Sequence, residues 1–312
     1  MSAERIALAV LGLGDIAQKA HLPVLAGRSD VDIVALASRS SRNAADLAAT
    51  HRFPVEATTI DQVIALRPAG ALVLTESGSH AELTCQLLEA EIAVYLEKPM
   101  ALDLTSARSI AECASRTDQL LMVGFNRRYA PLYLQLKELF LNQPAGQCHL
   151  LKTRQASSLK QSPADVVWDD VIHLIDLSRW LMGDPQQVHA TVQRGPEGEF
   201  VGMSVLLQYA DGRSTTLTQA IRTGGAQERV ELYGTSVSAW VENLEELHVQ
   251  REGVTETHAL DPWGVTLTRR GFTSALDHFV DCLRNRRSPT QSVQDALKSH
   301  ELAQTILDVA GV

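Results

Sequence analysis

A short apolar strand that runs directly into a glycine turn is the feature that most restricts the fold of this 312-residue chain. Residues 6–11 are all apolar, as expected of a parallel strand buried on both faces. Residues 12–17 read G-L-G-D-I-A and lead into a helix. Gly12 permits a tight turn, Gly14 lets the backbone approach a pyrophosphate, and Ala17 allows close packing of the helix on the strand. The pattern predicts a dinucleotide site formed by Gly12, Gly14, Asp15 and Ile16, where the N–H groups at the start of the helix meet the phosphates.

The end of the second expected strand, residues 32–38, predicts which dinucleotide binds. Enzymes that use NAD usually carry an acidic residue here, which binds the ribose 2′-hydroxyl. This chain has Ser38 and Arg39 instead, with Arg42 nearby. A hydroxyl and a guanidinium suit a 2′-phosphate, so we expect NADP to be preferred and NAD to be the alternative cofactor. Arg39 could instead stack on the adenine without discriminating between the two.

Strands and helices alternate over residues 1–125, which predicts an α/β class with an N-terminal Rossmann domain, a doubly wound parallel sheet. Polar residues follow three later strands, at the edge where a parallel sheet binds its ligands. The strand 93–96 ends in Glu97 and Lys98, and Pro99 then stops it. We therefore expect Lys98 to face a ligand, the alternative being a surface ion pair at the sheet edge. The predicted cofactor-binding residues at these strand ends are Thr75, His80, Glu97, Lys98 and Asn126.

The regular alternation of strands and helices ends after residue 125. Consecutive strand-like runs between residues 187 and 260, with a hairpin signal at residues 209–213, predict an α+β domain over residues 126–312 with an open, mostly antiparallel sheet. Two helices, at residues 272–285 and 293–310, follow. Helices on one face of such a sheet leave its other face in need of a partner. We therefore expect a homodimer or homotetramer assembled through this sheet.

A helix expected at residues 166–182 carries the second chemical signal. Asp169, His173, Asp176 and Trp180 follow one another at spacings of four, three and four, which places them on one helical face. Most of the remaining residues are apolar, so we expect the helix to be buried and these polar groups to serve each other or a ligand. One alternative is a closed network in which Asp169 or Asp176 orients His173. A metal held by Asp169 and His173 lacks an evident third ligand, so no metal is expected.

Composition narrows the class of partner. The net charge of −9 argues against binding to nucleic acid through counterion release. Four cysteines are far apart and form no CxxC pair, as expected of reduced thiols. We see no secretory signal and no apolar run long enough to span a bilayer. These features favour a cytoplasmic protein that acts on small molecules, with no nucleic-acid or membrane partner.

With these motifs in hand, the chain resembles the Gfo/Idh/MocA family of glucose–fructose oxidoreductase and inositol dehydrogenase, and within it the MviM-type oxidoreductases. The resemblance covers nearly the whole length. It rests on the GxGxxA turn, Ser79-His80, Glu97-Lys98-Pro99, Asp169-x-x-x-His173 with Asp176, and the segments 122–133 and 269–272. It implies NAD(P)-dependent oxidation or reduction of a sugar, cyclitol or related polyol, with Lys98 catalytic and Asp169 and His173 completing the site. The missing acidic residue after the second strand departs from an NAD-type pattern.

The expected reaction moves a hydride between nicotinamide and a carbinol or carbonyl carbon of the substrate. His173 could accept the hydroxyl proton, with Asp169 selecting its tautomer, while Lys98 stabilises the developing negative charge. Lys98 could instead be the base, and the sequence leaves that choice open. Arg127 could bind the substrate or be structural. Two rival functions are a redox-neutral, NAD-retaining glycosidase of the same family and a non-catalytic NADP-binding sensor.

Overall fold

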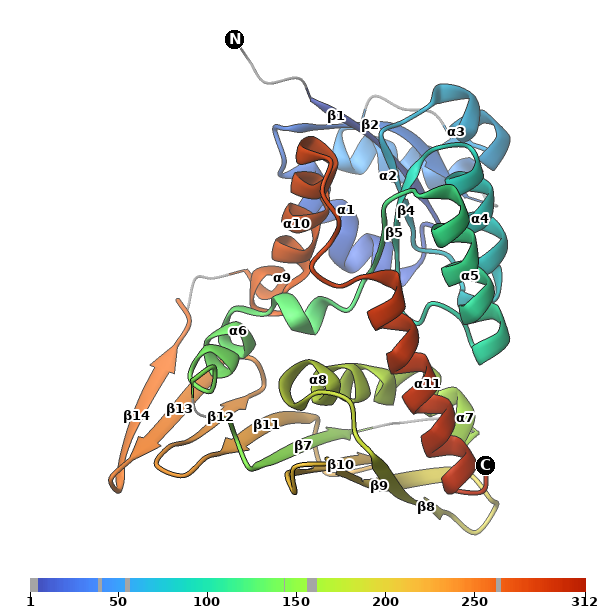
Figure 1. Ribbon diagram of the computed structural model, residues 1–312. Helices are drawn as coiled ribbons and strands as arrows, with labels where there is room; N and C mark the ends of the chain where they lie inside the picture. The colour runs from blue at the N-terminus through green and yellow to red at the C-terminus, as the bar shows by residue number, and fades with distance from the viewer. Residues whose placement is uncertain (1–4, 39–40, 54–56, 143, 156–161, 262–264) are drawn as a thin grey trace. The chain divides into compact units, whose positions relative to one another are not determined.

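The computed structural model describes residues 5–38, 41–53, 57–142, 144–155, 162–261 and 265–312. They form two compact units (Figure 1). The first unit contains the chain up to Phe125 together with Phe272–Lys298, and the second contains Asn126–Gly271 and Ser299–Val312.

The first unit is built on a six-stranded sheet in the order β3-β2-β1-β4-β5-β6, and every neighbouring pair is parallel. This is the strand order of a Rossmann domain, so the predicted doubly wound sheet is confirmed. The central strands are buried on both faces, as their continuous apolar sequences require. The strands are β1 Ile6–Leu11, β2 Val31–Ala37, β3 Ala57–Thr58, β4 Gly70–Val73, β5 Ala93–Leu96 and β6 Leu121–Val123.

Helices cover both faces of this sheet. Figure 1 shows α4 and α5 beside one face, and α1 and α10 beside the other. Local signals start two of the helices: Thr59 forms a capping box with Gln62 at α3, and the Asp103 side chain accepts the Ser106 N–H at α5, at 2.8 Å. The helical segments are η1 Ala17–His21, α1 Leu22–Ala26, α2 Ser41–His51, α3 Ile60–Leu66, η2 Ser77–Ser79, α4 His80–Glu89, α5 Leu104–Thr117 and α10 Phe272–Asn285.

Helix α10 corrects the expected domain boundary, which assigned residues 126–312 to the second domain. Its apolar face packs on the six-stranded sheet, where the rings of Phe279 and Tyr95 lie 5.7 Å apart and a Cβ at Gly70 would meet Phe279 at 3.1 Å. Ion pairs of Asp30 with Arg284 and of Arg28 with Asp277 fix the helix further. After forming most of the second unit, the chain therefore returns to the first. The order of the residues along the sequence does not reveal this return.

The second unit is built on an eight-stranded sheet in the order β14-β13-β12-β11-β7-β10-β9-β8. Only β7 and β10 pair in parallel among its described strands, so the predicted open and mostly antiparallel sheet is confirmed. The predicted hairpin joins β9 to β10, with Tyr209 N–H donating to Arg213 O at 3.0 Å. The strands are β7 Gln147–Arg154, β8 Gln187–Arg194, β9 Phe200–Gln208, β10 Ser214–Ile221, β11 Gln227–Tyr233, β12 Ser238–Glu242, β13 Glu246–Arg251 and β14 Val254–Ala259.

One continuous helical stretch packs on this sheet and contains a π-helical turn that the sequence did not predict. It consists of α7 Pro163–Val166, the π-helix η4 Val167–Val171 and α8 Ile172–Met182. Alternate residues of β10 are buried on the packed face, whereas Thr216, Thr218 and Ala220 on the other face are half-buried. The other helical segments are η3 Asn126–Tyr129, α6 Pro131–Glu138, α9 Thr266–Arg269 and α11 Val293–Val309, which begins in the first unit.

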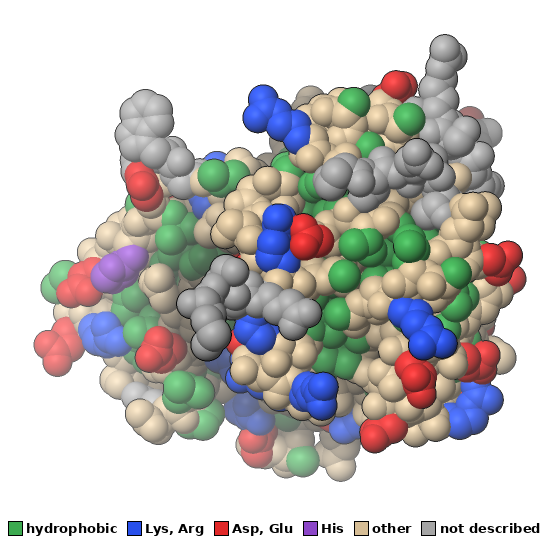
Figure 2. Space-filling model, turned by 90° about the horizontal axis from the view of Figure 1, so that it is seen from above, with side chains coloured by type: hydrophobic (Ala, Val, Ile, Leu, Met, Phe, Trp, Pro, Cys, Tyr) green, Lys and Arg blue, Asp and Glu red, His purple; other side chains and the backbone are tan. Residues whose placement is uncertain are grey.

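The surface shows no dominant charge on the face drawn in Figure 2, where acidic and basic side chains of the described residues are interspersed. None of the helices in the described ranges has the length and apolar character needed to cross a membrane. All four cysteines are free thiols.

Candidate active site

The turn after β1 is held against the turn after β4. Gly12 has φ +89°, a left-handed conformation, and its N–H donates to Ala37 O at 2.9 Å. A Cβ at Gly12 would lie 2.5 Å from Thr75 N, so no larger residue fits without moving the backbone. The glycine therefore brings two of the predicted cofactor-binding turns into contact.

Gly14, in contrast to Gly12, has open space around its backbone. No described atom lies within 4 Å of the position that a Gly14 Cβ would occupy. The start of the following helix is also open, with Ile16 half-buried and Asp15 exposed in an ion pair with Lys19. An exposed glycine backbone at a helix start is what a pyrophosphate requires, so these residues fit a dinucleotide. Direct binding by Gly14, Asp15 and Ile16 remains a prediction.

Ser38 directly follows β2 and is half-buried at the same edge of the sheet as the glycine turn. Arg39, the predicted partner of a 2′-phosphate, lies outside the described residues. No acidic residue stands at the end of β2. The prediction that NADP is preferred therefore still rests on the sequence alone.

Thr75 and His80 brace the loop after β4. The buried His80 ring places Nδ1 2.9 Å from Pro99 O and Nε2 3.1 Å from Thr75 O. Burial lowers the pKa of His80, which favours the neutral ring, and a neutral imidazole has one N–H to donate to these two carbonyl groups. The Thr75 hydroxyl accepts a hydrogen bond from Ser79 at 2.8 Å. The geometry favours an indirect role for His80, and direct cofactor binding by either residue stays a prediction.

Glu97 and Lys98 follow β5 and differ in their surroundings. The Glu97 side chain is buried, and its Oε2 accepts the backbone N–H of Lys98 at 2.7 Å. Its Oε1 lies 3.0 Å from His21 Nε2, a contact that sequence analysis missed. Lys98 is half-buried, and the Lys98–Pro99 peptide bond is cis. Glu97 was predicted to bind the cofactor, and these contacts favour a role in positioning Lys98.

In the second unit, Asn126 and Arg127 are buried and held by protein groups. Asn126 Nδ2 donates to Arg270 O at 2.7 Å. Arg127 donates from Nε and Nη2 to the two carboxylate oxygens of Glu228, at 2.9 and 2.8 Å, and Tyr133 donates to the same carboxylate. Burial raises the pKa of Glu228, but the charge and hydrogen bonds of Arg127 outweigh it and lower the pKa to about 2. These contacts correspond to the structural alternative for Arg127, and substrate binding stays a prediction.

The π-helix η4 changes which carboxylate is buried. Asp169 was expected on a buried face, but it is exposed, whereas the neighbouring Asp170 is buried. A π-helical turn holds an extra residue, so the side chains rotate relative to a regular helix. Asp170 accepts hydrogen bonds from Lys152, Arg154 and Gln219, at 2.5, 2.5 and 2.9 Å. His173, four positions after Asp169, is 7% exposed, so the predicted pair consists of one exposed and one nearly buried side chain.

Asp176 belongs to a further buried network. Both of its carboxylate oxygens accept hydrogen bonds from Arg128, at 2.8 and 2.7 Å, and Ser299 donates to Oδ1 at 2.9 Å. Arg179 in turn donates to the Ser299 hydroxyl at 2.8 Å. These contacts give Asp176 a role in holding α8 to η3 and α11.

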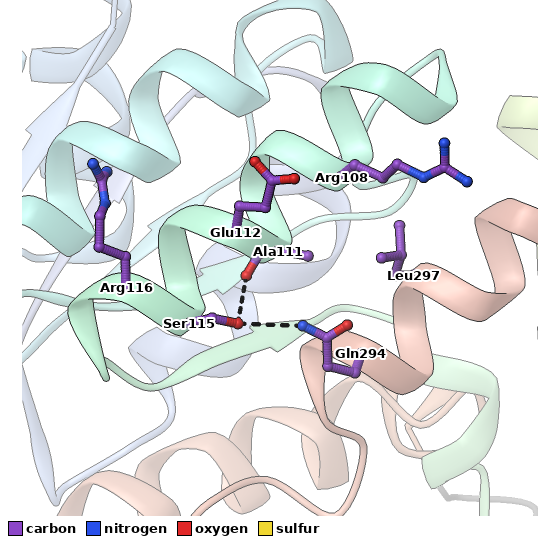
Figure 3. A pocket seen from close by; sticks show the side chains of 7 residues that line it. All are labelled: Arg108, Ala111, Glu112, Ser115, Arg116, Gln294 and Leu297. Atoms are coloured by element: carbon purple, nitrogen blue, oxygen red, sulfur yellow. Dashed lines mark hydrogen bonds between the residues drawn. The ribbon is translucent and has the colours of Figure 1, made fainter.

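Other hollows lie away from the predicted residues. A hollow of about 580 Å³ between α5 and the first turns of α11 is lined by exposed charges, and its labelled hydrogen bonds run from Gln294 to Ser115 and on to Ala111 O (Figure 3). Another, of about 900 Å³, lies at the amino ends of β4, β5 and β6 and includes Ala69, Ala93 and Leu121. No group of three or more potential metal ligands occurs among the described residues. The candidate site is thus the carboxyl edge of the six-stranded sheet.

The strand order, the open glycine turn and the polar strand ends define a class, the dinucleotide-binding Rossmann proteins. The family model described as "Oxidoreductase family, NAD-binding Rossmann fold" matches residues 6–125, and the GFO/IDH/MocA C-terminal domain matches residues 145–239. The chain belongs to the Gfo/Idh/MocA oxidoreductase family. The predicted resemblance and the prediction of a dehydrogenase are confirmed.

Three relatives cover nearly the whole chain. The protein YceM of Salmonella typhimurium is 28% identical over 302 residues, which cover 96% of each chain. Inositol 2-dehydrogenase of Rhizobium meliloti is 27% identical and covers 94% of this chain and 93% of its own length. The MviM dehydrogenase structure from Clostridium difficile superimposes with a TM-score of 0.91 at 23% identity, covering 98% of this chain and 99% of that one.

Proposed function

We propose that this protein is an NADP-preferring dehydrogenase that interconverts a CH–OH group and a carbonyl group on a cyclitol, sugar or related polyol. The observation that carries the proposal is the position of Lys98 at the carboxyl edge of the sheet, with its backbone held by Glu97. A relative of nearly equal length is an inositol 2-dehydrogenase, which supports a polyol as substrate. NAD is the alternative cofactor, because the preference rests on Ser38, Arg39 and the lack of an acidic residue after β2.

The nicotinamide group, when bound, supplies the position that accepts or donates hydride. Lys98 donates a hydrogen bond to the reacting oxygen and stabilises negative charge on it. His173 accepts the hydroxyl proton when a polyol is oxidised, and donates a proton to the oxygen when a carbonyl group is reduced. Asp169, although exposed, is proposed to orient the His173 ring from four positions earlier in the helix. The main alternative is that Lys98 itself takes this proton.

Replacement of Lys98 tests the proposal. Lys98→Met should abolish turnover of myo-inositol, scyllo-inositol and an aldose panel, because the reacting oxygen loses its cationic partner. The dissociation constant for NADP, measured by calorimetry, should change little. Lys298→Met, at an exposed position on α11, is the matched control and should keep full activity. Full activity in Lys98→Met would falsify the proposal.

We also propose assembly through the open face of the eight-stranded sheet. A hollow of about 570 Å³ lies here, and its lining includes His189, Leu206 and Thr218. Leu206 and Thr218 are half-buried, although both belong to the face that does not pack on α8. A second copy of this chain would cover that face and give a homodimer or homotetramer.

A further inference from the structure

His21 and Glu97 form a buried polar pair that the proposed mechanism does not use. They lie 76 positions apart in the sequence, and Nε2 of His21 is 3.0 Å from Oε1 of Glu97. His21 is 0% exposed and Glu97 4%. The second oxygen of Glu97 accepts the backbone N–H of Lys98 at 2.7 Å. A single carboxylate therefore connects His21 to the backbone of Lys98.

The π-helix η1 supplies His21 to this contact. It spans Ala17–His21, directly after the glycine turn that fits the pyrophosphate, and His21 is its last residue. The extra residue of a π turn changes the direction of the side chains that follow it, and such turns are frequent at functional sites. The helix that starts at the predicted cofactor site is thus the element that reaches Glu97.

Aromatic rings fix the orientation of His21. Tyr95 contacts the imidazole edge-on with ring centroids 5.4 Å apart, and Phe272 does so at 5.5 Å. Tyr95 belongs to β5, the strand that Glu97 directly follows, and Phe272 begins α10. The ring is therefore packed by side chains from two other elements of the first unit.

The hydrogen-bond pattern assigns the His21 tautomer. Nδ1 is buried and has no hydrogen-bond partner among the residues that the structure describes. A buried N–H without an acceptor is costly, so the proton belongs on Nε2, where Glu97 accepts it. Oε2 of Glu97 accepts the Lys98 N–H, so both oxygens of this side chain act as acceptors. The hydrogen bond from the ring orients the Glu97 side chain.

We propose that His21 is a positioning residue for Lys98, acting through Glu97, and this inference rests on the proposed catalytic role of Lys98. His21 fixes the Glu97 carboxylate, and the carboxylate fixes the backbone from which the lysine side chain extends. The same contact links the helix at the dinucleotide turn to the reacting group. Small displacements of a reacting group are costly, since about 1 Å can reduce a rate about 100-fold.

Two substitutions at position 21 separate the hydrogen bond from packing. His21→Phe keeps an aromatic ring against Tyr95 and Phe272 but removes the N–H. His21→Gln retains an N–H donor close to the position of Nε2. We expect His21→Phe to lower kcat for myo-inositol oxidation about 10- to 100-fold with little change in the KM for NADP. His21→Gln should recover most of the lost rate.

The reactivity of Lys98 gives a readout that needs no substrate. Reductive methylation followed by peptide mass spectrometry measures labelling of Lys98 relative to Lys19, whose side chain is 73% exposed. We expect the ratio to rise severalfold in His21→Phe and to stay near the wild-type value in His21→Gln. Glu97→Gln keeps the volume of Glu97 and should reproduce the His21→Phe result, so it replaces that variant if the latter does not fold.

The outcomes distinguish this inference from the proposed function. If Lys98→Met is inactive while His21→Phe keeps both the wild-type kcat and the wild-type labelling ratio, His21 does not position Lys98. If His21→Gln melts like the wild type yet shows the full defect of His21→Phe, the donor hydrogen bond is not responsible and the inference fails. If Lys98→Met is fully active, the proposed function fails first. The double variant His21→Phe/Glu97→Gln should be no slower than the slower single variant, because residues that act as a unit are not additive.

Discussion

Arg127 and Glu228 are 101 positions apart and form a two-point ion pair inside the second unit. Their side chains are 7% and 10% exposed, and Tyr133 donates a third hydrogen bond to the carboxylate. The Asp170 network likewise joins a helical segment to the sheet, and the Asp176 network joins α8 to η3 and α11. Breaking one partner of such a pair leaves an uncompensated buried charge.

Arg127→Met should therefore destabilise the protein by about 3–5 kcal/mol, measured by urea denaturation. Replacing both partners, as in Arg127→Met/Glu228→Leu, should cost less than the sum of the single changes, since no lone charge remains. Arg154→Met is the control: its side chain is 53% exposed and shares Asp170 with Lys152, so we expect a loss of at most about 1 kcal/mol. Equal losses in Arg127→Met and Arg154→Met would contradict the prediction.

The same pair should make stability depend on pH. Glu228 has a pKa of about 2 in the folded protein, below its ordinary value of 4.5. The folded state therefore binds this proton less readily than the unfolded chain, so the contribution of Glu228 is complete above about pH 4.5 and is lost as the pH falls towards about 2. It amounts to about 3 kcal/mol. Urea denaturation between about pH 7 and about pH 3 should show the difference between the wild type and Glu228→Gln shrinking; a constant difference would be evidence against this origin.

The two glycines of the turn should respond differently to alanine. Gly12→Ala places a Cβ 2.5 Å from Thr75 N at a left-handed φ, so it should lower the free energy of unfolding by about 2 kcal/mol or more. Gly14→Ala meets no described atom within 4 Å, so stability should change by less than about 1 kcal/mol. Its methyl group enters the proposed phosphate position, and the dissociation constant for NADP should rise about 10-fold or more. Unchanged NADP binding in Gly14→Ala would place the dinucleotide elsewhere.

Ser38→Asp should reverse the cofactor preference. A carboxylate at this position can accept the ribose 2′-hydroxyl of NAD and repels a 2′-phosphate. We expect the ratio of the dissociation constants for NADP and NAD to rise about 10- to 100-fold, measured by calorimetry. Ser109→Asp, on the exposed side of α5, adds the same charge elsewhere and should leave the ratio unchanged. A wild-type protein that already binds NAD more tightly would refute the NADP preference.

The open sheet face should hold the assembly together. Light scattering of the wild type should give two or four times the chain mass of 34.0 kDa. Leu206→Glu introduces a charge on that face and should reduce the mass towards a single chain. Leu141→Glu, at a position that is 66% exposed after α6, is the control and should keep the wild-type mass. A single-chain mass for the wild type would rule out this mode of assembly.

The local patterns of the sequence were sufficient for most elements of the fold. The structure reproduces the predicted bounds of β5 and α10, because apolar runs and glycine or proline stops act over a few neighbouring residues. The alternation of strands and helices also predicted that Thr75, Glu97 and Lys98 follow strands of one parallel sheet. These residues therefore lie at one edge of the sheet, because all strands of a parallel sheet end on the same side.

Tertiary structure decided which polar residues are buried together and with which unit each segment packs. The contacts of His21 with Glu97 and of Arg127 with Glu228 join positions 76 and 101 residues apart, and no local periodicity encodes them. The π turn in η4 buries Asp170 and exposes Asp169. Helix α10 returns to the first sheet because its apolar face packs against Tyr95. The sequence by itself determined the elements and the edge that carries Lys98, because those depend on neighbouring residues. The surroundings of Lys98 depend on the path of the whole chain, and only the folded structure specifies them.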